Sequence, residues 1–258
     1  MATGSNIRRR SWLGEAWDST LGKKLFAAGS ATILVAYLLL HMLGNLTALW
    51  GTGGSAPRID LYGEWVREFG TPLLPHGGFL WIVRAILLAA IVVHVVAVIQ
   101  LAKRNRAARP APHAAKKIGR SWAARSMIVT GPLLIGFIVF HILHFTTLSI
   151  TVTPLHHGEV YANLYGAFQK WYFVLIYLVG VFLIGTHLRH GLWSMLQTFG
   201  LDDRRRRDRA KAGATIVATG LAIGFVLVPI SFWTGALPEP VESAHATVTS
   251  ITALTARI

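Results

Sequence analysis

The sequence contains no cysteine and few charged residues, and both shortages restrict what the chain can be. Without thiols the chain forms no disulfide, has no thiolate nucleophile, and by itself holds no thiolate-bound zinc or iron–sulfur cluster. Only 14% of its 258 residues are charged, against about a quarter in a soluble domain, while 53% are hydrophobic. The composition therefore indicates a membrane protein, and it leaves 11 histidines as the conspicuous metal-capable side chains.

Five apolar runs are long enough to cross a bilayer as helices, which takes about 20 residues each. They are Leu25–Trp50, Leu80–Leu101, Met127–Leu148, Trp171–Leu196 and Ala212–Thr234. Glycine recurs inside them, as close helix packing in lipid favours, and no β-strand pattern competes. We predict an all-α polytopic membrane protein with five transmembrane helices, the first of which is retained rather than cleaved as a signal peptide.

Basic residues in the connections predict the orientation. Residues 1–24, 102–126 and 197–211 hold 19 Lys and Arg, whereas residues 51–79, 149–170 and 235–258 hold 4. We therefore expect a cytoplasmic N-terminal segment (1–24), a transmembrane domain (25–234) and an external, loosely ordered tail (235–258). The basic charge is explained by topology and anionic lipid, so we expect no nucleic-acid partner.

Histidine is the unusual residue inside the spans, which contain no Asp or Glu and only two arginines. The six histidines are His41, His94, His141, His144, His187 and His190. Intramembrane ionisable groups are costly and usually mark function, although a single neutral histidine can simply hydrogen-bond a neighbouring helix. Four separate spans that each carry one favour a functional interpretation.

Depth along the helices groups four of these histidines into two pairs. At 1.5 Å per residue, His41 and His141 lie roughly 22–26 Å from the cytoplasmic ends of the first and third spans. His94 and His187 fall in the inner half of the second and fourth spans, roughly 15 Å deeper. Each pair could offer two imidazoles to one flat metal macrocycle, and two axial imidazoles suit a low-spin, electron-transferring haem.

Further residues near these pairs are candidates for supporting roles. Arg84 and Arg189 could pair with haem propionates or extend to lipid headgroups. His144 and His190 each lie one turn beyond a paired histidine, and spacing alone does not decide which of the two neighbours binds iron. Gly44, Gly185 and Gly191 could let a macrocycle approach the backbone.

The residues in these spans resemble a known family, the five-helix, two-haem cytochrome b membrane-anchor subunit of succinate dehydrogenase and fumarate reductase. The likeness is strongest to actinobacterial members. It is carried by LLLHMLGNL (38–46), DLYGEWVREFGTPLLPHGGFLWIVR (60–84), VVHVV (92–96), RSMIVTGPLLIGFIVFHILHFT (125–146), HGEVYANL (157–164) and HLRHGLW (187–193). These segments cover spans one to four.

The resemblance implies a succinate:menaquinone oxidoreductase subunit in the bacterial plasma membrane. By that likeness two haem b groups are bound, the outer one by His41 and His141 and the inner one by His94 and His187. It favours His187 over His190 and His141 over His144. It also implies a flavoprotein subunit and an iron–sulfur subunit on the cytoplasmic side, with menaquinone as electron acceptor.

The amphipathic stretch from Tyr62 to Phe69 is the candidate quinone site on the outer side. Quinone reduction consumes protons, and a carboxylate open to the outer water can relay them, with Glu64 the first choice and Glu68 the second. This stretch could instead be an interfacial helix that caps the bundle, and quinone could instead react at the inner face, near Trp12 or Trp17.

Two other functions and one other cofactor stay open on the sequence alone. The chain could be a cytochrome b anchor for another membrane dehydrogenase, or a transporter with a histidine proton relay. In place of haem, some of the histidines could bind a Rieske-type iron–sulfur cluster, but a chain without cysteine supplies only half of its ligands.

Overall fold

A computed structural model describes residues 11–53, 56–108, 122–151, 155–201 and 205–240 of the chain. This part is mostly helical, and five of its helices are long and apolar enough to cross a membrane. The spans are Thr20–Trp50, Gly78–Ala107, Ser126–Thr146, Trp171–Thr198 and Arg207–Trp233. The five predicted helices are therefore confirmed.

Shorter helices lie between and beside the five spans along the chain. Their bounds are α1 Trp12–Asp18, α2 Thr20–Leu46, η1 Thr47–Trp50, α3 Arg58–Glu68, α4 Gly78–Ala107, α5 Trp122–His141, η2 Ile142–Thr146, α6 Val160–Phe168, α7 Trp171–Thr198 and α8 Arg207–Trp233. The η1 segment is a 3₁₀ turn that continues α2, and η2 is a π-helical turn that continues α5. The stretch from Tyr62 to Phe69, predicted to be helical, is helical up to Glu68 and forms the second half of α3.

Local chemistry places the helix ends a few residues away from the ends of the apolar runs. The first span begins at Thr20 because the Ser19 hydroxyl caps it, accepting a hydrogen bond from the Gly22 amide at 2.8 Å. Lys23 is buried against α1, where its ammonium donates to the Trp17 carbonyl at 2.5 Å and lies 4.7 Å from the centre of the Trp17 ring. The second span extends past Leu101 because Arg104 and Arg106 suit a helix C-terminus.

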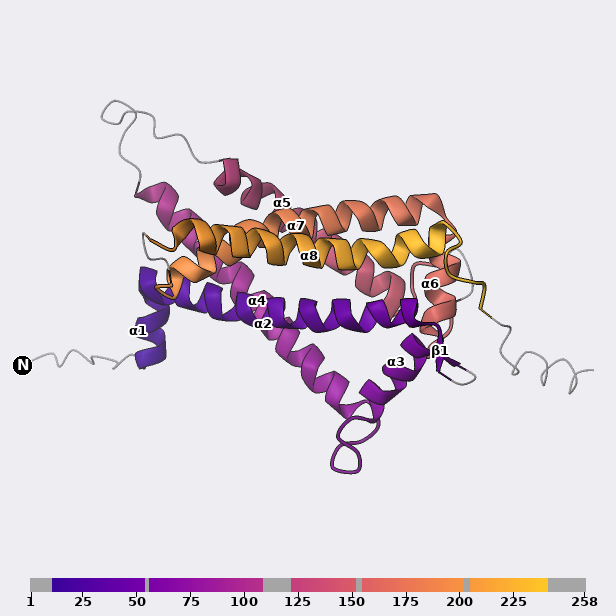
Figure 1. Cartoon of the computed structure of the whole chain (residues 1–258). Coiled ribbons are helices and arrows are strands. Elements are labelled where there is room, and N and C mark those ends of the chain that lie inside the picture. Colours follow the sequence, from indigo (N-terminus) through magenta and orange to yellow (C-terminus); the bar gives the residue numbers. More distant parts are fainter. Residues whose placement is uncertain (1–10, 54–55, 109–121, 152–154, 202–204, 241–258) are drawn as a thin grey trace, which may run out of the picture.

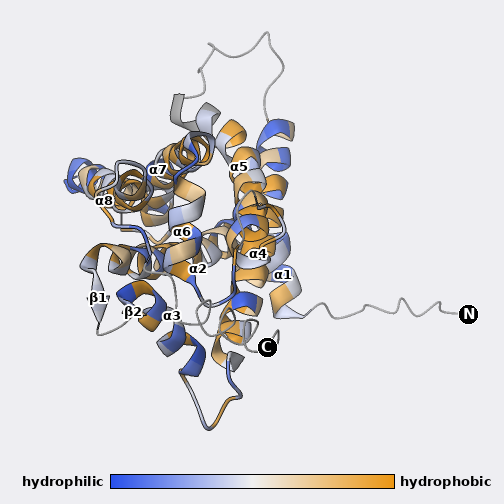
Figure 2. Cartoon of the chain, turned by 90° about the vertical axis from the view of Figure 1, so that its right-hand side faces the viewer, coloured by the Kyte–Doolittle hydropathy of each residue, from blue (hydrophilic) through white to orange (hydrophobic). Residues whose placement is uncertain are grey.

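The long helices form a bundle in which α7 and α8 run side by side and α2 lies along them (Figure 1). Helix α5 packs on α7, while α4 crosses α2 and diverges from it towards α3. We call the two ends of the bundle the α1 end and the α3–α6 end. Figure 2 shows that most residues along the long helices are apolar. Large exposed side chains such as Trp81, Leu88 and Phe182 are what a helix in lipid presents.

Two apolar clusters hold the bundle together. One lies at the α3–α6 end, where Tyr161 and Phe168 of α6 pack with Tyr177 of α7 and Phe232 of α8. The other joins α7 to α8 through residues such as Leu192 and Leu221. The first cluster closes the bundle beside His141 and His144, because Tyr177 belongs to it and contacts both rings.

One small element was not expected from the sequence. Thr52–Gly53 (β1) and Ala56–Pro57 (β2) pair as a two-residue antiparallel ribbon between α2 and α3. Gly51, at φ 72°, turns the chain into it, and the Arg58 amide closes the loop on the Gly51 carbonyl at 3.0 Å. A ribbon this short has no periodicity that a sequence can display.

Candidate functional site

His41 on α2 and His141 on α5 face one another inside the bundle. Their ring centres lie 5.8 Å apart and their planes are inclined by 74°. Two imidazoles bound on opposite sides of one metal ion, with bonds of about 2 Å, have ring centres roughly 6 Å apart. The separation of these two rings therefore matches that of two axial ligands.

Tyr177 on α7 lies beside this pair and contacts both histidines of the third span. Its hydroxyl lies 3.3 Å from Nδ1 of His141 and 3.1 Å from Nδ1 of His144. The His144 ring is only 1% exposed and is stacked on Phe145 and Phe173, with ring centres 4.2 and 4.3 Å away. Of the two neighbouring histidines, His141 is thus the one whose ring faces His41.

His94 on α4 and His187 on α7 form the second pair and lie close enough to interact electrostatically. Nδ1 of His94 donates to the Ala27 carbonyl of α2 at 3.1 Å. Nδ1 of His187 lies 3.2 Å from the Thr130 hydroxyl of α5, which itself donates to the Ser126 carbonyl at 2.9 Å. Since the hydroxyl proton is used there, His187 must donate through Nδ1. Both rings therefore keep the Nε2 lone pair for a metal.

The contacts place the two pairs at different levels of the bundle. On α5, Thr130 marks the level of the second pair, and it is 11 residues, or ~16 Å, from His141. On α7, Tyr177 marks the level of the first pair, and it is 10 residues, or ~15 Å, from His187. The two levels agree with the depth separation expected from the sequence.

A donor set of two neutral imidazoles fits a haem better than a bare metal ion. Among the described residues, no three His, Asp or Glu side chains gather closely enough to hold a metal ion by themselves. A haem iron, by contrast, already has four ligands in its macrocycle and takes only two more. Each pair lies between helices and offers two ligands, so the residues present fit this group.

The other candidates have more varied surroundings. Arg84 on α4 is exposed at the α3–α6 end, where its guanidinium lies 4.8 Å from the centre of the Trp81 ring. Arg189 is exposed on α7 and donates to the Thr215 hydroxyl of α8 at 3.1 Å. His190 is half-buried and lies near both Arg189 and His187.

The sequence suggested that Gly44 lets a macrocycle approach the backbone, but its close neighbour in the structure is the Tyr62 side chain. A Cβ on Gly44 would lie 2.6 Å from the ring of Tyr62, so the glycine lets α3 pack against α2. A Cβ on Gly185 would meet Ala222 of α8 at 3.5 Å, and one on Gly191 would meet nothing within 4 Å. The glycine next to the first pair is thus explained by packing between helices.

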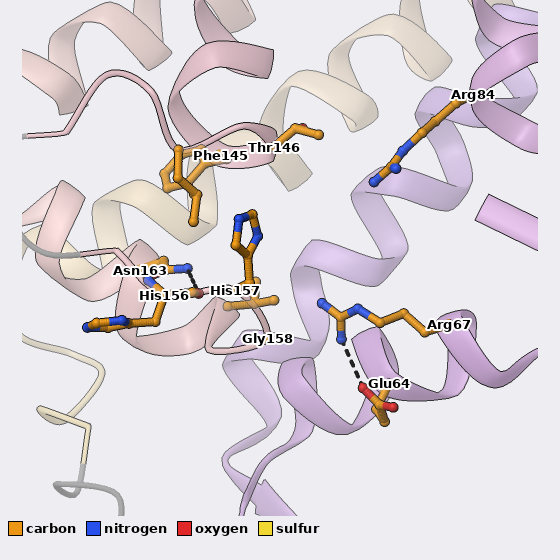
Figure 3. Close-up of a pocket in the computed structure, with 11 residues that line it drawn as sticks. Glu64, Arg67, Arg84, Phe145, Thr146, His156, His157, Gly158 and Asn163 are labelled. Carbon is orange, nitrogen blue, oxygen red and sulfur yellow. Dashed lines mark hydrogen bonds and ion pairs between the residues drawn. The ribbon is translucent and has the colours of Figure 1, made fainter. Parts of the chain in front are cut away.

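A cavity of about 420 Å³ opens at the α3–α6 end, between α3, α4, η2 and α6. Figure 3 shows the guanidinium groups of Arg67 and Arg84 and the ring of His157 directed into it. Glu64 lines this cavity, half-exposed, with its carboxylate 3.1 Å from Arg67 and 4.0 Å from His76. Leu148, with a φ of 53° that is uncommon outside glycine, also lines it.

Sequence reasoning missed the groups that hold the histidines in place. Tyr177 and Thr130 contact the paired rings through side chains, and Ala27 does so through its carbonyl. A tyrosine within an apolar run is a usable signal, since its hydroxyl requires a partner in lipid. A threonine bonded to the preceding turn of its own helix is common in such runs, and an alanine carries no signal at all.

These features define a class, a five-helix membrane protein with two histidine pairs stacked along its bundle. No family model matches the chain, and no match was found among the curated proteins or the solved structures.

Proposed function

We propose that the chain is the cytochrome b membrane anchor of a succinate:menaquinone oxidoreductase. The observation that carries the proposal is that two histidine pairs, His41 with His141 and His94 with His187, lie at two levels of one bundle. The resemblance of spans one to four to the two-haem anchors of succinate dehydrogenase supplies the particular enzyme.

In this proposal the four histidines hold two b-type haems, each ligated on both faces. Such haems supply one-electron redox centres with no open coordination position. The Ala27 carbonyl and the Thr130 hydroxyl orient His94 and His187, so that Nε2 of each faces the inner centre. The apolar helices exclude water from both levels.

The α1 end faces the cytoplasm in this proposal, because the basic connections lie there. It is the surface on which an iron–sulfur subunit, carrying a flavoprotein subunit, would dock. Of the cytoplasmic connections, the segment with Lys116 and Lys117 lies outside the described residues.

The cavity at the α3–α6 end is the proposed place for menaquinone reduction. It lies at the outer end, and Glu64 reaches it from α3. The carboxylate is half-exposed, so it can take protons from the outer water and pass them to a quinone oxygen. Arg67 and Arg84 provide hydrogen-bond donors for that oxygen and positive charge for a reduced quinone.

Purification of the intact membrane complex tests the proposal. We expect a reduced-minus-oxidised absorption spectrum with haem b bands, two haems per chain by pyridine haemochrome assay, and flavoprotein and iron–sulfur subunits in the same preparation. A preparation without haem rejects the proposal. A dihaem chain that co-purifies with a different dehydrogenase keeps the cytochrome assignment and rejects the succinate assignment.

A further inference from the structure

The hydrogen-bonded chain between His141, Tyr177 and His144 is not used by the proposed function. Tyr177 is 8% exposed and its hydroxyl contacts Nδ1 of both histidines, at 3.3 and 3.1 Å. It comes from α7, whereas the two histidines lie on α5 and η2. A tyrosine of one helix thus bridges two imidazoles of another.

The proton inventory allows two complete arrangements of this chain. A phenol has one proton to donate, and a neutral imidazole has one N–H. Either His141 donates to Tyr177 and Tyr177 donates to His144, or both bonds run in the opposite direction. If both histidines donated, the phenol proton would be left without either of these acceptors.

A metal on His141 selects between these arrangements. A metal bound through Nε2 leaves the ring proton on Nδ1, so His141 must donate to the Tyr177 oxygen. Tyr177 then donates to Nδ1 of His144, whose own proton sits on Nε2. His144 is held for this role by its stacking between Phe145 and Phe173.

We infer that Tyr177 is a positioning residue that fixes the ring orientation and tautomer of His141, and that His144 is the acceptor that orients the Tyr177 hydroxyl. The inference rests on the proposed function, because it concerns the outer haem. It also assigns the unequal roles of the two histidines of the third span, with His141 as ligand and His144 as the end of the hydrogen-bonded chain.

The expected consequence is a change in the electronic character of the outer haem alone. A ligand imidazole that donates from Nδ1 is more basic and favours oxidised iron. Removing the acceptor should therefore raise the midpoint potential of the outer haem. The inner pair, ~15 Å away, has its own oxygen partners and should be unaffected.

The test is a redox titration of the intact complex with Tyr177→Phe, followed through the two haem components of the spectrum. We expect both haems to be retained, one component to shift to higher potential, and the other to stay in place. Tyr172→Phe is the matched control, since it removes a hydroxyl from the same helix, at a ring packed beside Trp171 and Phe173. The unshifted inner component reports that the variant is folded.

His144→Phe is the second variant, because it keeps an aromatic ring between Phe145 and Phe173. We expect a smaller shift in the same direction, since Tyr177 still accepts from His141. Loss of one haem in His144→Phe would overturn the inference, because His144 would then be the ligand. Unchanged potentials in Tyr177→Phe would also overturn it while leaving the proposed function intact, whereas a wild-type complex without haem would reject both.

The positions of the imidazole protons give a second measurement, one that needs no haem. Nitrogen-15 NMR of histidine-labelled, haem-free protein in lipid should show the His141 and His144 signals change when Tyr177 is replaced by phenylalanine. The signals of His94 and His187 should stay fixed, because their partners are Ala27 and Thr130. His141 and His144 signals that do not respond to the replacement would contradict the bridge.

Discussion

At the residue scale, the two histidine pairs are distinguished by what holds their Nδ1 atoms. The pair at the α1 end is fixed by a carbonyl and a threonine hydroxyl from α2 and α5. In the pair at the α3–α6 end, one member is fixed by Tyr177 of α7, while His41 stacks on Tyr37 at 5.4 Å. Each level is therefore tied to helices that carry histidines of the other level.

Single replacements of ligands should remove the haems one at a time. If each pair holds one haem, as proposed, His41→Ala should lose about half of the haem and one spectral component, and His94→Ala should lose the other component. The measurement is haem per chain together with the low-temperature spectrum of each variant. His157→Ala, at the cavity and outside the pairs, is the control that should keep both components. Loss of the same component in both ligand variants would show that the pairing is wrong.

Glu64 and Glu68 lie on the same helix, but of the two only Glu64 is among the residues that line the cavity. If Glu64 relays protons to quinone, Glu64→Gln should lower succinate:quinone turnover by about a hundredfold, the lower end of what a positioned acid or base contributes. Haem content and succinate oxidation by a soluble dye should stay normal. Glu68→Gln is the matched control, and equal turnover in the two variants would reject the assignment.

The sequence predicted which histidines share a level of the bundle better than it predicted their hydrogen-bond partners, and the reason is physical. Depth depends only on counting residues at a fixed rise, so residue numbers alone are enough to match His41 with His141. Which way a ring points depends on helix rotation and on neighbours distant in sequence. Ala27 and His94 are 67 residues apart, and the role of Ala27 is played by its carbonyl.

At the element scale, the short helices at the α3–α6 end lock the bundle where the cavity opens. Asp60 of α3 caps α6, accepting a hydrogen bond from the Tyr161 amide at 2.9 Å. Tyr161 donates to the Pro238 carbonyl at 2.9 Å, and Gln169 donates to the Phe232 carbonyl at the same distance. These bonds explain why α6 is helical although it is only 9 residues long. Hydropathy alone did not reveal this helix.

The Asp60 cap should make the docking of α6 depend on pH. Burial raises the pKa of Asp60, the nearby charge of Glu159 adds to the rise, and the Tyr161 and Val160 amides together with Arg67 oppose it. An acid whose pKa is higher when folded binds more protons in the folded state, so stability falls as pH rises through the interval between its ordinary and its raised value.

Hydrogen exchange at the Tyr161 amide measures this dependence, once the intrinsic exchange rate is divided out. We expect protection to decrease from about pH 4 upward in the wild-type protein and to stay level in Asp60→Asn, whose carbonyl still accepts the amide. Glu159→Gln should narrow the pH interval over which protection decreases, without abolishing it, because the Glu159 charge is only part of what raises the pKa of Asp60. Wild-type protection that increases with pH would contradict the raised pKa.

At the scale of the whole molecule, the exposed surface and the buried chemistry have opposite characters. Most residues of the long helices are apolar (Figure 2), and many large apolar side chains are exposed, while His94, His141 and His187 meet oxygen partners from other helices. Hydropathy sums over about 20 neighbours, so it predicted all five spans. It could not predict that α4 diverges from α2 towards α3, because a crossing depends on contacts between helices and not on the hydropathy of either one (Figure 1).

The absence of cysteine makes the orientation of the molecule directly testable, since the chain has no background thiol. Leu73, 93% exposed between α3 and α4, and Leu201, 61% exposed between α7 and α8, lie in connections at opposite ends of the bundle. With 19 basic residues on one side and 4 on the other, Leu73→Cys should react with a membrane-impermeant maleimide in intact cells. Leu201→Cys should react only after the membrane is permeabilised. The reverse labelling pattern would place the α3–α6 end in the cytoplasm, and it would reject both the docking surface and the outer quinone site.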